Sequence, residues 1–422
     1  MITFSHCNIL DGTKDMVVQS DMNIIVDGEK IIEISKEVKG EEINCAGMYV
    51  IPGLINLHVH LPGSGYPKKK QQASSKLAKL ATSNAQTRAI TMNMCEGYAK
   101  TALKSGVTTI RCVGGLDDYD TNLRDKNSKD LPRMLVSNQA ITVPGGHMAG
   151  SVAIPVNSAE ECVEVFDHIT SKNVDLIKIM VTGGVMDATV RGEPGVVKMN
   201  EKLVSLICSM AHKKGLPVAA HVESTKGLEV ALKNGVDTIE HGAVVTDEII
   251  DLYQQKKAAV VCTLSPAIPY AKFDRNITHI GELFQYNGNV VLDGIIDNAK
   301  KGLKYGIPVG LGTDTACPYT THYNMYRELI YFEKLVGVSK SFAIYSATLN
   351  NAKIAGIDDI TGSIEIGKSA DLLFVKNNPL HDLSVLKNPS MVVYKGSPLK
   401  DIKIKKNKEV DTLLDEYILS LA

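Results

Sequence analysis

Six side chains able to bind a metal ion are spread along this 422-residue chain, most of them at the ends of short apolar segments. They are His58, His60, Lys178, His221, His241 and Asp314. Alternation along a strand sends residues two apart to the same side, so the rings of His58 and His60 can reach one ion. A single His-x-His pair is a weak signal, but the six groups together predict a metal centre.

Lys178 differs from the other five because it lies inside the apolar stretch DLIKIMV. An ammonium group buried there without a partner would cost several kcal/mol. One interpretation is an ion pair with a neighbouring acid such as Asp175. The other is that CO₂ converts the amine to a carbamate, which removes the positive charge and supplies two oxygen ligands. The presence of four histidines and an aspartate favours the carbamate.

Short apolar strands alternate with amphipathic helices from about residue 51 onward, which is typical of repeated βα units and a parallel sheet. We expect strands at 51–60, 106–115, 133–142, 175–184, 217–222, 238–242, 258–266 and 308–315. Eight such strands close a (β/α)₈ TIM barrel, whose reactive groups project from the carboxyl ends of the strands. The histidines and the aspartate fall at these ends, so the predicted barrel brings them together.

Both ends of the chain have β character and are expected to pair into one small domain beside the barrel. Its parts are 1–50 and 355–400, and the barrel spans 51–354. The tail, 401–422, is expected to form a helix whose apolar face docks onto the body or onto a partner subunit.

Two polar segments, 61–90 and 266–290, follow the first and seventh predicted strands. Loops at these strand ends surround a barrel active site, so each segment is a candidate lid or a surface decoration.

The amino-acid composition and the terminal pattern argue against several classes of protein. The 46 basic and 47 acidic side chains nearly cancel, so no global field favours a nucleic acid or an anionic membrane. The eight cysteines form no CxxC pair, and the N-terminus lacks a secretory pattern. We therefore expect a cytoplasmic enzyme with a small-molecule substrate, no nucleic-acid or membrane partner, and a homo-oligomeric state.

Several motifs resemble those of the amidohydrolase superfamily, in the expected order and over nearly the whole chain. They are VIPGLINLHVH, the lysine of DLIKIMV, the two single histidines, GTDT and GSIEIGKSADLLFV. Within that superfamily, PGGH (144–147), DLIKIMVTGGVM (175–186) and GVDTIEHG (235–242) resemble metal-dependent dipeptidases of the Xaa-Pro type, with imidazolonepropionase-like enzymes nearby. The resemblance implies a TIM barrel with a small β-sandwich domain built from both termini.

The resemblance also implies a binuclear centre, with zinc as the expected metal. One ion would take His58, His60, Asp314 and one oxygen of carboxylated Lys178. The other ion would take the second oxygen, His221 and His241. A hydroxide bridging the two ions would attack a C–N bond, and Asp314 would accept its proton and return it to the leaving amine. The implied enzyme is a dipeptidase, a carboxypeptidase or an N-acyl amino acid amidohydrolase.

Four residues are candidates for substrate contact. His147, after the third strand, is placed to donate to a substrate carbonyl or carboxylate, although Gly145 and Gly146 could instead make a simple turn. Arg191 suits a carboxylate, and His322 follows Asp314 by eight residues. Glu223 stands where dipeptidase-like relatives carry Tyr or His, so it would favour a cationic group or point away.

Two other functions stay open. A mononuclear deaminase or imidazolonepropionase-like cyclic-amide hydrolase usually lacks the lysine and has Glu three residues after the fifth-strand histidine, where this chain has Ser224. A non-catalytic scaffold typically loses ligands, whereas all six are present here. Both comparisons favour the binuclear hydrolase.

Overall fold

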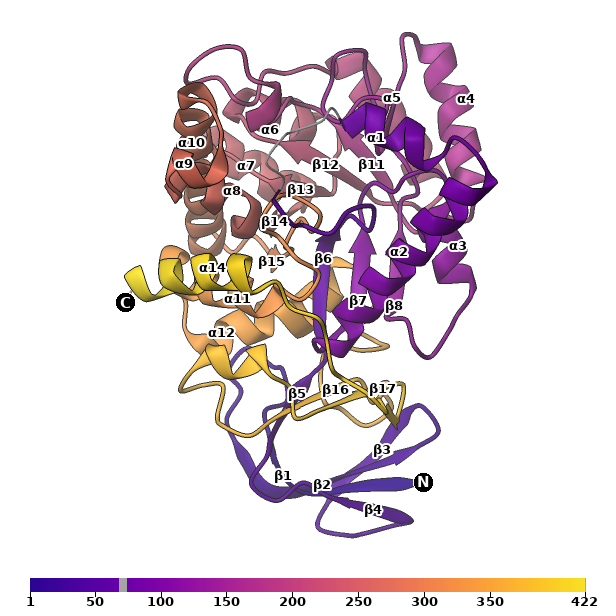
Figure 1. Ribbon diagram of the computed structural model, residues 1–422, viewed down its shortest axis with the longest axis vertical. Helices are drawn as coiled ribbons and strands as arrows, with labels where there is room; N and C mark the ends of the chain where they lie inside the picture. The colour runs from indigo at the N-terminus through magenta and orange to yellow at the C-terminus, as the bar shows by residue number, and fades with distance from the viewer. Residues whose placement is uncertain (68–73, 422) are drawn as a thin grey trace.

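The computed structural model describes residues 1–67 and 74–421. Its body is made of parallel strands surrounded by helices (Figure 1). One parallel sheet contains β6 (Leu54–Val59), β7 (Val107–Cys112) and β8 (Arg133–Val136). The other has the order β10 (Ala153–Pro155), β9 (Ala140–Thr142), β11 (Ile177–Met180), β12 (Val218–Val222), β13 (Thr238–His241), β14 (Ala259–Cys262) and β15 (Val309–Leu311). The predicted mixed α/β architecture with a parallel sheet is confirmed.

The helices of the body follow the strands in alternation. They are α1 (Ser74–Ala81), α2 (Ala85–Lys104), α3 (Tyr119–Asp125), α4 (Ala159–Thr170), α5 (Glu201–Lys213), α6 (Thr225–Lys233), α7 (Asp247–Lys256), α8 (Leu264–Lys272), α9 (Arg275–Thr278), α10 (Glu282–Lys304), α11 (Met325–Tyr331), α12 (Lys340–Tyr345) and α13 (Asn351–Ile354). Many begin at a capping side chain, such as Asn200 of α5 and Ser224 of α6, which satisfies a free backbone N–H group.

Two predicted strands differ from the structure. The strand expected at 133–142 is broken into β8 and β9, because Asn138 adopts a left-handed backbone conformation with φ 56°. β8 pairs with β7 and β9 pairs with β11, so the broken strand connects the two sheets. The strand expected at 258–266 ends at Cys262. The polar segment expected after it, 266–290, is largely helical and contains most of α8, all of α9 and the start of α10.

The first and last body strands are held together at their carboxyl ends. The Asp314 N–H donates to the His58 carbonyl at 2.8 Å. The Asn56 side chain donates to Thr313 Oγ1 at 2.7 Å, and its oxygen accepts the Thr313 N–H at 3.0 Å. These contacts support the predicted closure of a (β/α)₈ barrel, which stays a prediction.

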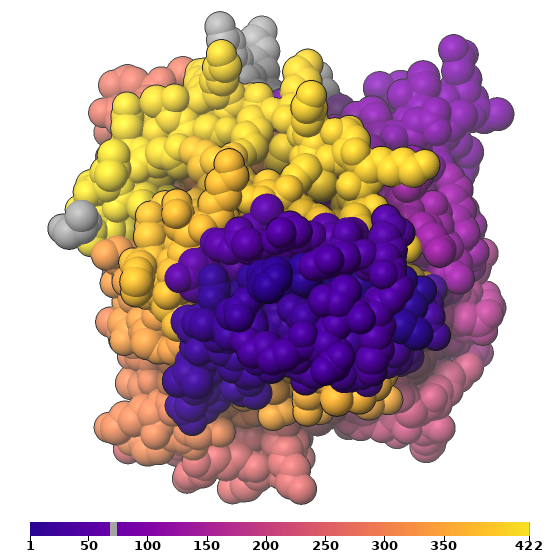
Figure 2. Space-filling view, turned by 90° about the horizontal axis from the view of Figure 1, so that it is seen from below, coloured from indigo at the N-terminus to yellow at the C-terminus, as the bar shows by residue number. Residues whose placement is uncertain are grey.

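Strands from both ends of the chain form a single sheet. Its order is β18 (Ser397–Pro398), β17 (Met391–Tyr394), β16 (Leu372–Val375), β5 (Tyr49–Pro52), β1 (Ile2–Ile9), β2 (Gln19–Asp27) and β3 (Lys30–Ser35), with β4 (Glu41–Asn44) beside β1. The antiparallel pair of β5 and β16 joins strands from the two ends of the chain. This sheet lies at the bottom of Figure 1, and its N-terminal part faces the viewer in Figure 2. The arrangement as a sandwich, and the domain boundaries, stay predictions.

The C-terminal helix α14 (Lys408–Ser420) packs on the body, and 401–407 precede it without helix. Val410 and Leu414 are fully buried on the predicted apolar face. Among the described residues, no helix is long and apolar enough to cross a membrane. Residues 68–70, the basic part of the first candidate lid, lie outside the described residues.

Candidate metal centre

Five of the predicted metal ligands lie in one buried cluster at the carboxyl ends of the strands. The ligand atoms of His58, His241 and Asp314 all lie within 4.8 Å of one another. His241 also belongs to a second such group, with His221 and Glu223. His60 Nε2 lies 3.2 Å from Asp314 Oδ1, which brings the second histidine of the His-Val-His pair to the first group. The predicted convergence of the strand ends therefore occurs.

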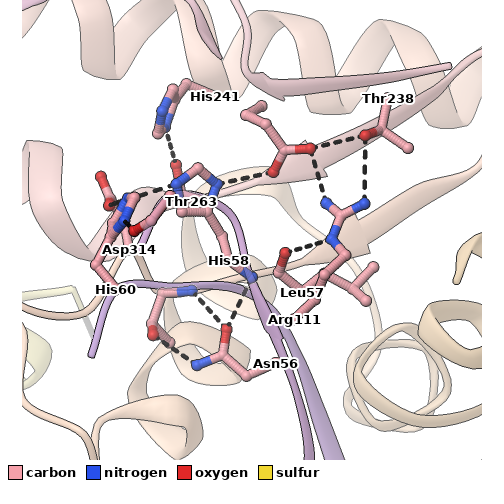
Figure 3. Close-up of polar contacts among 12 residues, drawn as sticks. Asn56, Leu57, His58, His60, Arg111, Thr238, His241, Thr263 and Asp314 are labelled. Carbon is pink, nitrogen blue, oxygen red and sulfur yellow. Dashed lines mark hydrogen bonds and ion pairs between the residues drawn. The ribbon is translucent and has the colours of Figure 1, made fainter. Parts of the chain in front are cut away.

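Each of the four histidines has one ring nitrogen held by a protein acceptor (Figure 3 shows three of them). The contacts are His58 Nδ1 to Glu240 Oε2 (2.7 Å), His60 Nδ1 to the Gly114 carbonyl (2.7 Å), His241 Nδ1 to Thr263 Oγ1 (2.7 Å) and His221 Nε2 to the Gly183 carbonyl (3.1 Å). Such contacts fix the ring orientation and tautomer of metal-binding histidines. The other nitrogens of His58 and His60 face Asp314 Oδ1 at 3.4 and 3.2 Å. The donor set thus fits divalent metal ions.

Burial also favours the neutral form of His58, His221 and His241, as metal binding requires. Burial and the nearby Lys178 lower the pKa of His58 to about 4. The pKa of His221 and the pKa of His241 are both well below the usual value, with burial as the largest cause in each. Asp314 has the opposite balance: burial raises its pKa, but His58 and His60 outweigh burial and hold the pKa well below the usual range.

Lys178 is 1% exposed, and within the described part of the chain its Nζ has no hydrogen-bond partner. The predicted alternative, an ion pair with Asp175, is wrong. Asp175 instead accepts from the Val136 N–H at 2.8 Å and from Arg124 at 3.3 Å. Burial lowers the pKa of Lys178 to about 8, which leaves an appreciable neutral fraction near neutral pH.

A buried hydrogen-bond network holds the His58 ring, and its residues were not predicted from the sequence. Glu240 accepts from His58 through one oxygen, and from Arg111 (2.7 Å) and Thr238 (2.8 Å) through the other. Arg111 also donates to the Leu57 carbonyl at 2.7 Å, as Figure 3 shows. Burial raises the pKa of Glu240, but Arg111 and His58 outweigh it and hold the pKa well below the usual range. The sequence did contain a sign of this network, because Arg111 and Glu240 are opposite charges that each lie within an apolar strand.

His147 lies in the loop after β9, five residues beyond the strand end at which it was expected. Its ring nevertheless stacks on His221, with 4.1 Å between centroids and 4° between planes. His147 Nδ1 contacts Asp187 Oδ2 at 2.5 Å, and the same oxygen accepts the Gly184 N–H at 2.9 Å. This contact orients the His147 ring beside the cluster, and Asp187 is a further residue that the sequence analysis missed.

The other three substrate candidates have different surroundings. Glu223 lies at the cluster, where burial, Asp314 and Asp187 raise its pKa to about 8. His322 is buried, donates from Nε2 to the Gly63 carbonyl at 2.8 Å and stacks on Tyr98.

Arg191 is 61% exposed, so the structure does not bury it with the cluster. It contacts α10 through the Tyr286 ring, 4.1 Å from its guanidinium carbon, and through Glu282 at 3.2 Å.

Comparison with known proteins is consistent with this geometry. Ochratoxinase from Aspergillus niger is 25% identical over 369 residues, which cover 81% of this chain and 72% of that protein. Imidazolonepropionase from Fusobacterium nucleatum is 23% identical over 400 residues, which cover 86% of this chain and 88% of that protein.

Two solved structures are similar over almost the whole chain. A proposed prolidase from Bifidobacterium longum has a TM-score of 0.86 and 32% identity, with 98% of each chain covered. A Xaa-Pro dipeptidase with methionine in its active site has a TM-score of 0.82 and 29% identity, with 95% of this chain and 100% of that chain covered. The amidohydrolase family itself matches residues 49–399. The chain therefore belongs to the amidohydrolase family.

Proposed function

We propose that this enzyme is a binuclear metal-dependent hydrolase that cleaves an amide or peptide C–N bond. The observation that carries the proposal is Lys178, an enclosed amine for which the described residues offer no acceptor. It lies beside the four histidines, each of which has one ring nitrogen already held by the protein. A structural lysine would have an acceptor, whereas a ligand precursor would not. His58, His60 and Asp314 would hold one ion, and His221 and His241 the other, with carboxylated Lys178 between them.

The surroundings of Lys178 support its carboxylation. The neutral amine forms an N–C bond to CO₂, and the nitrogen then loses a proton to solvent, which leaves a carbamate anion. Burial favours the neutral amine, which is the form that reacts with CO₂, and metal ions held by the neighbouring ligands would stabilise the carbamate anion. Glu240 and Asp314 favour the ammonium form of Lys178, but burial outweighs both and lowers the pKa of the amine to about 8.

The two metal ions, with zinc as the expected metal, would supply hydroxide near neutral pH and polarise the scissile carbonyl. Asp314 would accept a proton at a carboxylate oxygen and return it to the leaving amine. His147 Nδ1 donates to Asp187, and the imidazolium form of His147 would donate from Nε2 to a substrate carbonyl or carboxylate oxygen. His322 would line the pocket near Gly63, and Arg191 would bind a substrate carboxylate only if it left α10.

The substrate classes best supported are dipeptides, peptides with a free C-terminus and N-acyl amino acids. Solved relatives include a Xaa-Pro dipeptidase and a proposed prolidase, at 29% and 32% identity. A cyclic-amide hydrolase or a deaminase is the second candidate, because imidazolonepropionase is also a relative. The buried Lys178 favours the first group, since the second usually lacks this lysine.

A substrate screen tests the proposal. Metal-supplemented enzyme would be assayed against dipeptides and N-acyl amino acids for amine release, and against cyclic amides and aminated heterocycles for ring opening and ammonia release. We expect turnover in the first set. Turnover confined to the second set would favour the alternative enzyme, and a complete lack of turnover with metal bound would favour a non-catalytic scaffold.

A further inference from the structure

Glu223 is the feature of the site that the proposed chemistry does not use. It follows β12 and lies two residues after His221, with its backbone N–H donated to Thr182 Oγ1 at 3.0 Å. Gly195 packs directly on its backbone, because a Cβ on that glycine would lie 2.3 Å from the Glu223 carbonyl carbon. The backbone of Glu223 is therefore fixed, and its carboxylate belongs to the wall of the site.

The Glu223 side chain faces the metal-ligand cluster. Its carboxylate oxygen lies within 4.8 Å of ring nitrogens of both His221 and His241. Its Oε2 atom is enclosed, and no described residue donates a hydrogen bond to it. An enclosed carboxylate oxygen without a donor is costly, so such a group indicates that a ligand supplies the partner.

Among residues 1–67 and 74–421, no cationic side chain contacts this carboxylate. Asp187 is close but carries the same charge and is already paired with His147. Arg191, the nearest arginine along the loop, contacts Tyr286 and Glu282 instead. The described part of the chain thus leaves the carboxylate without a cationic partner, and a ligand group with a positive charge or a strong donor would supply one.

We propose that Glu223 is a specificity-determining residue that binds an ammonium group of the substrate, close to the scissile carbonyl. The inference rests on the proposed function and names its substrate class. Because Glu223 lies against the ligands His221 and His241, the cation must be only a few bonds from the carbonyl. The α-ammonium group of an N-terminal residue meets this requirement, whereas a long lysine or arginine side chain would extend past it. The enzyme then prefers peptides with a free N-terminus to N-acyl amino acids.

Two substrate series that differ only in this charge test the inference. One is L-alanyl-X and the other is propanoyl-X, with X taken from all proteinogenic amino acids. We expect wild-type kcat/KM to be higher for the alanyl member of each cleaved pair by roughly tenfold to a hundredfold. The E223Q variant should lose most of this ratio, mainly by slower cleavage of alanyl substrates. The E164Q variant, at an exposed position of α4, should keep the wild-type ratio.

The outcomes separate the inference from the function on which it rests. If the wild-type enzyme cleaves neither series, the proposed function and this inference both fail. If it cleaves both series and the E223Q ratio equals the wild-type ratio, the inference alone is overturned. Metal content is the second readout, because Glu223 could itself bind a metal ion. Unchanged metal content supports substrate binding, whereas loss of a metal ion in E223Q would make Glu223 a ligand and overturn the inference.

Discussion

At the scale of single residues, the candidate site depends on hydrogen bonds that hold one ring nitrogen of each histidine. Glu240, Thr263 and two backbone carbonyls engage one nitrogen of each histidine, and the other nitrogen is left toward the cluster. Asp314 is held by its backbone N–H to the His58 carbonyl and has φ 54°, an unusual conformation for a residue with a side chain. The precise positions of these groups are therefore set by their neighbours.

Replacement of Asp314 by Asn tests its proposed role as the proton acceptor. The amide keeps an oxygen for metal binding but cannot take up the proton. We expect kcat to fall by roughly 10²–10⁴-fold, with metal content largely preserved. The measurement is steady-state kinetics on the best substrate together with metal analysis. Retained activity would remove Asp314 from proton transfer.

Replacement of Thr263 by Val tests the support of His241. The substitution keeps the side-chain shape but removes the oxygen at 2.7 Å from Nδ1, so the ring loses its fixed orientation. We expect metal affinity to weaken by roughly 10–100-fold. T108V is a matched control, because Thr108 is equally buried and its hydroxyl has no described partner. Equal losses of affinity in T263V and T108V would show that the effect is not specific to the His241 contact.

At the scale of elements, the candidate metal ligands lie at the carboxyl ends of the strands, and the helices that pack around the strands stabilise the fold. The C-terminal helix α14 is fastened to α11 by Arg327, which is fully buried and donates to Asp411 at 2.9 Å and to Asp415 at 2.8 Å. Arg327 also donates to Asn324 at 3.1 Å, in the segment that follows Asp314. The helix at the end of the chain is thus connected to the loop after β15.

The R327M variant tests this connection. Removal of the guanidinium leaves Asp411 and Asp415 without their shared partner, although Asp415 is partly exposed and also contacts Lys387. We expect the free energy of unfolding to fall by roughly 2–4 kcal/mol. Urea unfolding measures this loss, and R275M at an exposed position of α9 serves as the control. A loss no larger than that of R275M would contradict the proposed fastening.

The buried Asp120 of α3 predicts a pH-dependent stability away from the metal centre. Burial raises its pKa to about 7 from an ordinary 3.8, and its Oδ2 has no described partner. The folded state therefore holds a proton that the unfolded state has lost between these values, so stability decreases as pH rises. From about pH 5 to pH 7, the wild-type protein should lose about 2 kcal/mol relative to D120N. Urea unfolding at both pH values measures this loss, and D130N, at an exposed position, is the control. The prediction would be contradicted if the difference in unfolding free energy between wild type and D120N were the same at both pH values, or changed no more than the difference between wild type and D130N.

At the scale of the whole molecule, the sequence predicted much of the architecture. Alternating apolar strands and helices indicated the parallel sheet. The helical segment after β14 and the break at Asn138 were missed, because both depend on contacts with distant parts of the chain. Asn138, for example, donates to Asp118 and Thr121.

The candidate site was predictable to a similar extent. Ligand types at strand ends identify the cluster, because strand direction alone decides where those side chains meet. The supporting residues Glu240, Arg111 and Asp187 could not be assigned, since a charge in a strand does not indicate which distant partner it faces. The cytoplasmic location, the homo-oligomeric state and the division into domains stay predictions.

The central claim is that carboxylated Lys178 joins two metal ions, and the most direct measurement is metal content together with the chemical state of this lysine. Protein prepared with carbon-13 bicarbonate would be analysed for bound metal and, by NMR, for a labelled carbamate. We expect about two metal ions per chain and a carbamate signal that K178M loses and K202M, at an exposed position of α5, retains. One metal ion per chain with an unmodified Lys178 would contradict the account.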